Sequence, residues 1–551
     1  MIKRSLLIAS LFSFFFVTYG QVENPPENVV ITSKKKETKV FENESGVLHV
    51  NVSRKNIKNF KKKGVILYSD FNAIGDGKTD DMDAIAATHA FANAHNLKVK
   101  ADEGFTYYIG GKDRSAVIKT DTDFGNASFI IDDTNIENKD TSIFLVRSSN
   151  EPFKLNGLKS LKKNQKKIDI SLEESSLITV TNSNTKHYIR YGLNQDNGSD
   201  QTDIFVVDKN GNVDMDAPII WDFDQITKAT ALPIDKTTLY ITGGHFTTIA
   251  NKAASKYTYY SRNMVIGRSN VIVDGLEHHI KGEGEHGAPY RGFVSTRDCA
   301  YITIKNTILT GHKMYRTIGS AGKPVSMGSY DLSLTRSLNV TVENCSQTND
   351  INDGAYWGLQ SSNYSKNLVY DNCTFSRFDA HKGVANATIR NSTLGHMGIN
   401  AIGCGTLVVE NSTINGRNLI NLRSDYGSTW QGEVFIKDCV FVPSGGRKPT
   451  SASLFGGTYT GKHDFGYICY MPEKITIENL QIKDTNHPDD YLGPAIFNNF
   501  NKNMTDASYQ EEYPSVKTKE VILKNVTTAS GKELMVSSNP YMFKDVKVIT
   551  K

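Results

Sequence analysis

Apolar and polar residues alternate in a short phrase that recurs through the second half of the chain. In each copy, apolar and often β-branched residues at every second position lead to Asn or Asp and then usually to a small residue, as at 340–345 and 407–412. Alternation with a period of two predicts a β-strand with one buried face. The Asn or Asp of the phrase recurs at Asn306, Asn344, Asn372, Asn391, Asn411, Asp438, Asn479 and Asn525.

The spacing of these positions predicts a solenoid. Successive copies are 38, 28, 19, 20, 27, 41 and 46 residues apart, so the shortest intervals approximate one bare coil and the longer ones carry loops. A self-similar unit made of strands is typical of β-solenoids. Asn tolerates a left-handed turn between strands, and its amide can hydrogen-bond along the stack. The small residues that follow are expected to form an inward-facing column: Cys345, Cys373, Ser392, Ser412 and Cys439.

A second signal lies at residues 71–85, which join a short apolar run at 65–68 to a helical pattern. Gly75 and Gly77 supply turn conformations that are closed to residues with a Cβ atom. Residues 79–81 are natural N-cap and first-turn residues, where carboxylates meet the helix dipole. This stretch predicts a strand, a glycine turn and a helix. The alternative is an isolated loop and helix of an α/β domain, because Gly-Asp-Gly by itself is common.

The first half of the chain is less regular. Residues 129–133 and 143–146 resemble early coils, whereas 188–192 and 204–211 indicate a hairpin-rich β subdomain, the latter turning at Asn210-Gly211. A polar segment near the N-terminus predicts a loosely packed lead-in. We therefore divide the chain into a signal peptide, the lead-in, an entry motif with cap helix and early coils, a β-rich insertion, and the main β-helix with the active-site groove, at residues 1–20, 21–63, 64–150, 151–240 and 241–551.

The N-terminus has the layout of a secretory signal peptide. Lys3 and Arg4 precede an apolar run at 6–17 and then Thr18-Tyr19-Gly20-Gln21, so we expect cleavage after Gly20. The run is too short to span a bilayer as a helix, and no later segment is long and apolar enough to do so. A secreted or periplasmic protein without membrane insertion is expected.

Charge and cysteines narrow the function classes. The formal net charge of +4 over 551 residues is too weak to argue for nucleic acid or membrane binding. Lysine runs at 34–36, 61–63 and 154–167 are interpreted as solvated surface, with contact to an acidic polymer as the alternative. All six cysteines lie at or beyond Cys299 and none forms Cys-x-x-Cys, so we expect buried small residues and no zinc site or disulfide framework.

Residues 71–85 and the Asn ladder together resemble the pectate-lyase-like parallel β-helix superfamily of secreted bacterial polysaccharide lyases, over about residues 64–130 and 262–530. The resemblance implies an all-β, right-handed parallel β-helix with an N-terminal capping helix and a β-rich insertion. Some similar gut-bacterial lyases act on glycosaminoglycans such as chondroitin sulfate. Glycosidases and phage tailspikes share the entry motif, so the motif is specific for the fold and weak for the substrate.

Two branches of this superfamily fit poorly. The polygalacturonase branch would carry Asn-Thr-Asp, Asp-Asp, Gly-His-Gly and Arg-Ile-Lys segments, of which only Gly395-His396-Met397 is a fragment here. The clustered acidic ligands of a calcium-dependent pectate lyase are not seen in these coils. The need for a metal stays open, and a divalent cation such as calcium is compatible with the chain.

Counting from the ladder places candidate residues on one sheet. We predict successive strands of this sheet at residues 378–383, 399–403 and 419–423. His381 is then expected to lie beside Asn400 on the next coil, and Asn400 beside Ile420 or Asn421 on the coil after that. The preceding corner is expected to stack Arg377, His396 and, with a one-residue slip, Arg417, while residues 356–360 form the preceding strand. The substrate-binding set is predicted as Arg377, His396, Arg417, Arg423, Tyr356, Trp357 and Gln360.

This set suits β-elimination of a uronic-acid polysaccharide. His381 is the candidate base, with Lys382 behind it, and Asn400 is the candidate partner of the substrate carboxylate. Tyr426, Tyr356 or a water is the candidate acid. Arginine side chains can bind carboxylate or sulfate in bidentate fashion. Each residue also has a plainer explanation as a turn cap, a ladder member, a rim charge or loop packing.

Three functions remain open. The first is a polysaccharide lyase acting on an acidic glycan, as a monomer. The second is a glycoside hydrolase of the same architecture, which needs two carboxylates flanking the bond and has Asp353, Asp379 and Asp425 as candidates. The third is a non-catalytic glycan-binding solenoid.

Overall fold

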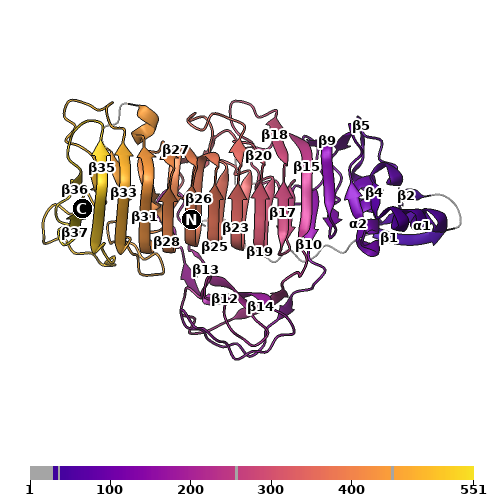
Figure 1. Ribbon diagram of the computed structural model, residues 1–551, viewed down its shortest axis with the longest axis horizontal. Coiled ribbons are helices and arrows are strands. Elements are labelled where there is room, and N and C mark those ends of the chain that lie inside the picture. Colours follow the sequence, from indigo (N-terminus) through magenta and orange to yellow (C-terminus); the bar gives the residue numbers. More distant parts are fainter. Residues whose placement is uncertain (1–28, 35–37, 255–258, 448–451) are drawn as a thin grey trace, which may run out of the picture.

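The structure, a computed structural model, describes residues 29–34, 38–254, 259–447 and 452–551. The predicted signal peptide lies outside the described residues. Within them, 28 strands form one continuous parallel β-helix, and they stand side by side along the long axis in Figure 1. The predicted all-β solenoid is confirmed. None of the helices in the described ranges is long and apolar enough to cross a membrane.

The strands of the β-helix are β4 Val65–Leu67, β5 Asp76–Asp80, β6 Lys98–Lys100, β7 Thr106–Ile109, β8 Ala116–Ile118, β9 Thr122–Asp132, β10 Phe144–Arg147, β15 Leu239–Ile249, β16 Met264–Gly267, β17 Val271–Asp274, β18 Glu277–Lys281, β19 Val294–Lys305, β20 Ile308–Leu309, β23 Leu332–Glu343, β24 Ser346–Gln347, β25 Gln360–Asp371, β26 Thr374–Arg390, β27 Thr393–Ala401, β28 Gly403–Glu410, β29 Thr413–Ile414, β30 Asn418–Leu422, β31 Trp430–Phe441, β32 Ser453–Gly456, β33 Lys474–Ile482, β34 Ala495–Phe497, β35 Glu520–Thr528, β36 Met535–Ser537 and β37 Lys547–Thr550. Outside it lie β1 Val29–Lys34, β2 Lys39–Glu42, β3 Leu48–Ser53, β11 Phe153–Lys154, β12 Ser176–His187, β13 Ser199–Val207, β14 Lys228–Pro233, the hairpin β21 Tyr315–Ile318 and β22 Pro324–Met327, and the helices α1 Arg54–Lys63 and α2 Met82–His95.

The Asn ladder is confirmed. Its eight members all have left-handed backbone, with φ between 44° and 53°. Amide hydrogen bonds join five of the seven consecutive pairs, as from Asn372 Nδ2 to Asn344 Oδ1 (2.8 Å) and from Asn525 Nδ2 to Asn479 Oδ1 (2.9 Å). Asn391 is an exception, because its amide donates to Asp371 instead. The left-handed turns and the stacked amides therefore fix where each coil bends.

The core is a column of apolar side chains stacked in register from coil to coil. One such column consists of buried side chains aligned by strand pairing: Ile302, Val340, Leu368, Ala387, Leu407, Val434, Ile475 and Val521. The expected inward column of small residues is also buried, and all six cysteines are free thiols. Because every coil buries the same face, the alternation seen in the sequence is enough to specify the stack.

Helix α2 closes the N-terminal end of the solenoid. Its side chains are buried almost all round, because the first coils lie on one side and β1–β3 on the other. Asp81 occupies the N-cap position, but its carboxylate accepts hydrogen bonds from the backbone of Ile74 and Gly75 instead of capping the helix. The prediction that the lead-in is loosely packed is wrong. Its strand β3 buries Leu48 and Val50 completely.

The insertion carries its own antiparallel sheet, ordered β11-β14-β12-β13, which hangs from the middle of the β-helix in Figure 1. It has a separate apolar core, and it docks on the solenoid through Ile204 and Val206, which pack with Leu338. A buried ion pair joins Asp203 to Lys366 of β25 at 2.7 Å. Residues 188–198, here called the crossing loop, connect β12 to β13 and run over the β-helix.

Candidate functional site

The register of the candidate sheet differs from the predicted one. Asp379, not His381, pairs with Asn400, and Asn400 pairs with Asn421, whose amide donates to Asn400 Oδ1 at 2.8 Å. The cause is an irregularity early in β27. Phe375 pairs with Leu394, but Arg377 pairs with Gly398, so two additional residues enter β27. A bulge of this kind moves every later residue along the pairing.

The same irregularity removes His396 from the predicted stack with Arg377. The backbone N–H of His396 donates to the carbonyl of Ile351 at 3.0 Å, and its Nδ1 lies 3.1 Å from the same oxygen. Arg417 is exposed and does not join the cluster. Tyr356 also lies outside the sheet, because β25 begins at Gln360.

Arg377 is buried and lies between two aromatic rings. Its guanidinium is 4.9 Å from the Trp357 ring centre and 5.7 Å from that of Tyr330. Gln360 is buried, and its Oε1 accepts the backbone N–H of Asp379 at 2.9 Å. Trp357 therefore packs against Arg377, and Gln360 fixes the backbone of Asp379.

Asp379 lies at the centre of a buried ionic cluster. Arg423 Nη1 is 2.7 and 3.0 Å from its two carboxylate oxygens, Arg377 Nη2 is 2.8 Å away, and Tyr330 Oη donates at 2.6 Å. Burial alone would favour the neutral acid, but the two guanidinium groups outweigh it and lower the pKa of Asp379. Asp379 is therefore an ionised, fully paired carboxylate.

The cluster continues to Asp425 and the crossing loop. Arg423 Nη2 donates to Asp425 at 2.8 Å, and Arg190 of the crossing loop donates to the same carboxylate from Nε at 3.0 Å and Nη2 at 2.8 Å. These cations hold the pKa of Asp425 well below its usual range against the effect of burial. Arg377 and Arg423, predicted to bind substrate, are therefore not free to do so, because carboxylates inside the protein already pair with them. Both arginines are neutralised inside the protein.

His381 lies on β26, two residues before the left-handed Gly383. We call residues 381–383 the corner. The Nδ1 of His381 is 3.0 Å from Asn363 Oδ1, which assigns the proton to Nδ1 and leaves the Nε2 lone pair free. Burial, and then the charge of Arg423, lower the pKa of His381 well below its ordinary value, so the ring is neutral. A neutral, oriented imidazole is the form that a general base requires.

Tyr426 and Lys382 are the nearest predicted partners of His381. The Tyr426 ring meets the His381 ring edge-on, with centres 5.7 Å apart, and the guanidinium of Arg190 lies 5.4 Å from the Tyr426 ring centre. Tyr426 is fully buried, its Oη has no hydrogen-bond partner among the described residues, and burial raises its pKa. Lys382 Nζ donates to Ser199 Oγ at 2.8 Å, and burial lowers its pKa.

Glycine at position 383 lets the insertion reach this corner. Gly383 has φ of +79°, and a Cβ atom built there would lie 2.1 Å from Tyr188 Oη. Tyr188, the first residue of the crossing loop, is itself left-handed (φ 56°), which is uncommon for an aromatic residue. Its ring packs against that of Tyr426 at 5.9 Å. Sequence reasoning missed Tyr188, Arg190 and Asn363, because nothing local places the insertion beside β25 and β26.

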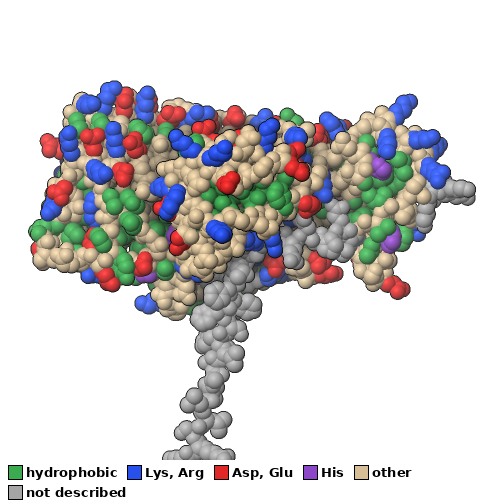
Figure 2. Space-filling model, turned by 90° about the horizontal axis from the view of Figure 1, so that it is seen from below, with side chains coloured by type: hydrophobic (Ala, Val, Ile, Leu, Met, Phe, Trp, Pro, Cys, Tyr) green, Lys and Arg blue, Asp and Glu red, His purple; other side chains and the backbone are tan. Residues whose placement is uncertain are grey.

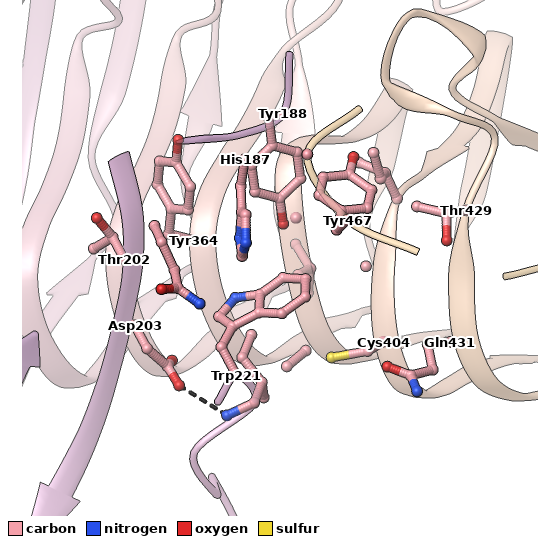
Figure 3. A pocket seen from close by; sticks show the side chains of 18 of the residues that line it. His187, Tyr188, Thr202, Asp203, Trp221, Tyr364, Cys404, Thr429, Gln431 and Tyr467 are labelled. Atoms are coloured by element: carbon pink, nitrogen blue, oxygen red, sulfur yellow. Dashed lines mark hydrogen bonds between the residues drawn. The ribbon is translucent and has the colours of Figure 1, made fainter. Parts of the chain in front are cut away.

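Two cavities lie near this corner; Gly383 lines only the smaller one, and His381 is not among the lining residues of either. The larger, 590 Å³, lies under the crossing loop and is lined by residues that include Arg190, Asp425 and His463. The smaller, 330 Å³, lies between the insertion and the β-helix (Figure 3). Seen from below, the molecule shows Lys and Arg side chains interspersed with Asp and Glu (Figure 2). Among the described residues no group of three or more His, Cys, Asp or Glu is placed to hold a metal ion, so no residues are identified for a calcium ion.

A solved phage tailspike structure shares the fold of the chain. No protein-family model matches the chain. A capsule KL64-specific depolymerase of Klebsiella phage P510 is 29% identical over an alignment of 115 residues that covers 17% of this chain and 11% of that protein, so the match spans about a tenth of the relative's length. The tailspike gp61 of Pseudomonas phage phi297 superposes with a TM-score of 0.52 at 12% identity, over 88% of this chain and 84% of that one. The Gp54 tailspike of Acinetobacter baumannii bacteriophage AP22, solved in complex with capsular saccharide, covers 92% of this chain and 81% of its own, with a TM-score of 0.45 at 10% identity.

Proposed function

We propose that the chain is an exported enzyme that depolymerises an acidic polysaccharide by β-elimination, with His381 as the base. The observation that carries this proposal is the neutral, oriented imidazole of His381, which contacts Tyr426 and has Arg423 and Arg190 as charged neighbours. The 590 Å³ cleft, whose wall includes Arg190 and Asp425, is the candidate position for the glycan chain. The capsule depolymerase relative and the tailspike-like fold support a polysaccharide as the substrate.

The chemistry has three requirements. A base removes the proton on the carbon next to the uronate carboxylate, the electron pair forms a carbon–carbon double bond, and the bond to the glycosidic oxygen breaks. His381 Nε2 accepts that proton. Positive charge at Arg190 and Lys382 stabilises the enolate that develops on the carboxylate. The leaving oxygen takes a proton from Tyr426 or a water. Tyr426 is fully buried, so a water or a movement of the crossing loop has to connect its Oη to substrate.

Hydrolysis is the second candidate, and one observation favours it: Asp379 and Asp425 lie on either side of Arg423 and contact the same guanidinium. Inverting and retaining glycosidases use two carboxyl groups, one of which is kept protonated as the acid. Here arginines lower the pKa of both Asp379 and Asp425. Neither is held in the acid form, so β-elimination is the better fit.

Product chemistry tests the proposal. The exported chain is incubated with chondroitin sulfate, hyaluronan, heparin, pectate and alginate, each with calcium and with chelator, while ultraviolet absorbance and reducing ends are both followed. Elimination leaves a conjugated uronate that absorbs, and chondroitin sulfate is the first polymer we would test. We expect His381→Ala to abolish the absorbance and the exposed Lys437→Met to leave it unchanged.

Other outcomes point elsewhere. New reducing ends without absorbance would assign hydrolysis, with Asp425→Asn as the next variant. No product from any polymer, combined with binding to one of them, would favour the non-catalytic solenoid.

A further inference from the structure

We propose that the 330 Å³ cavity between the insertion and the β-helix is a binding subsite for an uncharged pyranose ring of the polysaccharide. The inference rests on the proposed function for the identity of the polymer. It does not depend on whether the polysaccharide is cleaved by elimination or by hydrolysis. The cavity's volume is within the range of small-molecule sites.

The walls of the cavity come from both parts of the molecule, as Figure 3 shows. Trp221 of the insertion and Tyr467 of the solenoid face it, with ring centres 5.9 Å apart and planes 37° apart. His187 contacts Trp221 edge-on at 4.4 Å. The opposite side is the β-helix, including Cys404 and Gln431. Aromatic faces suit the apolar face of a pyranose, whose C–H groups can pack on them.

Two buried polar atoms of the residues that line these walls lack a hydrogen-bond partner in the part of the chain that the structure describes. Gln201 is 5% exposed; its Nε2 donates to the carbonyl of Asp222 at 2.9 Å, which orients the amide and leaves Oε1 unpaired. His187 is also 5% exposed, and its Nδ1 is unpaired. An unsatisfied buried polar atom costs about 1–3 kcal/mol. Sugar hydroxyls both donate and accept hydrogen bonds, so they match an amide oxygen and an imidazole nitrogen. Neighbouring protein atoms cover both of these atoms, so a sugar reaches them only when the side chains turn towards the cavity.

The charges around the cavity favour an uncharged ligand. Asp203 is paired with Lys366 at 2.7 Å and also accepts the N–H of Ile220 at 2.8 Å. Lys163 Nζ donates to Gln431 Oε1 at 2.8 Å, across the boundary between insertion and solenoid. Burial lowers the pKa of His187 to about 4, so this ring carries no charge at neutral pH. Lys163 is the one lysine or arginine among the described residues of the lining, and its ammonium is held by the Gln431 amide, so a uronate or a sulfate would have to compete with that amide for it.

The cavity adjoins the catalytic corner. Tyr188 lines it and also packs against Tyr426, and Gly383, two residues after His381, forms part of its lining. A polymer of alternating uncharged and acidic sugars could therefore place an uncharged ring here and an acidic one at His381. The insertion then contributes directly to substrate recognition.

Binding of free sugars to the full chain tests this inference without requiring turnover. Isothermal titration calorimetry would be run with glucose, galactose, mannose, N-acetylglucosamine, N-acetylgalactosamine and glucuronate. We expect at least one uncharged sugar to bind, and glucuronate to bind at least about tenfold more weakly. Gln201→Ala and Trp221→Leu should each weaken binding about tenfold, which is about 1.4 kcal/mol.

Control variants separate this inference from the proposed function. His381→Ala should retain sugar binding even where it abolishes cleavage, and exposed Lys437→Met should change neither. Thermal unfolding checks that each variant is folded, and Gln201→Ala carries the test if Trp221→Leu is not. The inference is overturned if none of the uncharged sugars binds, if glucuronate binds equally well, or if folded Gln201→Ala binds like the wild type.

Discussion

Asp379 and Arg423 are 44 residues apart in the sequence and form a buried, two-pronged ion pair, with Arg423 Nη1 2.7 and 3.0 Å from the two carboxylate oxygens. Asp379 lies on β26, and Arg423 directly follows β30, two coils farther along. The stacking of coils therefore creates a contact that no local pattern contains. Asp379 is two residues before the candidate base His381, and Arg423 also binds Asp425, which pairs with Arg190 of the crossing loop. The ion pair therefore connects the strand of His381 to the crossing loop.

Removing Arg423 should destabilise the fold strongly. Arg423→Ala leaves Asp379 buried with one guanidinium fewer, and breaking a buried ion pair costs about 3–5 kcal/mol. Because Arg377 and Tyr330 remain bonded to Asp379, we expect the lower end of that range. Urea unfolding gives the free energy directly. Exposed Arg417→Ala is the matched control, expected within about 0.5 kcal/mol of wild type, and equal stabilities of the two variants would contradict the prediction.

Gly383 should be intolerant of a side chain. In Gly383→Ala the new Cβ would lie 2.1 Å from Tyr188 Oη, so the crossing loop must shift in addition to the cost of a left-handed alanine. We expect a loss of about 2–3 kcal/mol in unfolding free energy, combining overpacking and backbone strain, together with reduced turnover.

Two comparisons isolate the contact with Tyr188. Gly104→Ala shares the left-handed backbone, with φ of +73°, but its Cβ would meet nothing within 4 Å, so it should show the backbone cost alone. Adding Tyr188→Phe to Gly383→Ala should recover part of the loss. If Gly383→Ala and Gly104→Ala lose equal stability, the contact has no energetic weight.

The pH dependence of turnover should reflect the neutral state of His381. Its lowered pKa keeps the base unprotonated below the pH at which a free histidine gains its proton, about 6.5. The acid limb of kcat/KM should therefore lie below pH 6.5. Lys382→Met removes a positive neighbour, so it should raise the pKa of His381 and move the limb to higher pH. Exposed Lys437→Met should leave the limb in place. An acid limb above pH 6.5 in the wild type would exclude His381 as the base.

A second buried cluster predicts how stability depends on pH. His312 Nε2 is 3.0 Å from Asp331 Oδ1 and its Nδ1 is 3.3 Å from Glu283 Oε1, while His278 Nδ1 lies 2.6 Å from the other oxygen of Asp331. Burial disfavours the charged imidazolium, but the two carboxylates outweigh it and raise the pKa of His312 to about 10. The folded protein therefore holds a proton that the unfolded chain releases near pH 6.5.

Because the pKa of His312 is higher in the folded protein than in the unfolded chain, raising the pH lowers the stability of the fold. The stabilisation is complete below pH 6.5 and is lost as pH rises towards 10, by up to about 1.4 kcal/mol per pH unit. Urea unfolding at pH 6, 7, 8, 9 and 10 measures it. His312→Gln should be less stable at pH 6 and should show a flatter decline than the wild type. Parallel curves for the two proteins would show that His312 does not keep its proton.

The sequence by itself determined the solenoid. Period-two alternation with Asn turns at coil-length intervals leaves one way to bury the apolar face, so the ladder and the buried column of small residues could be read directly. It also identified His381 and Tyr426, which the structure brings into ring contact.

Tertiary structure decided the rest of the site. Two additional residues in β27 shifted the register and placed Asp379 beside Asn400, and Arg377 and Arg423 became internal counterions. Arg190 and Tyr188 came from an insertion whose docking depends on side chains far apart in the chain. Local patterns repeat in every coil and fix the stack, whereas bulges, ion pairs and docking are single long-range events that leave no periodic trace in the sequence.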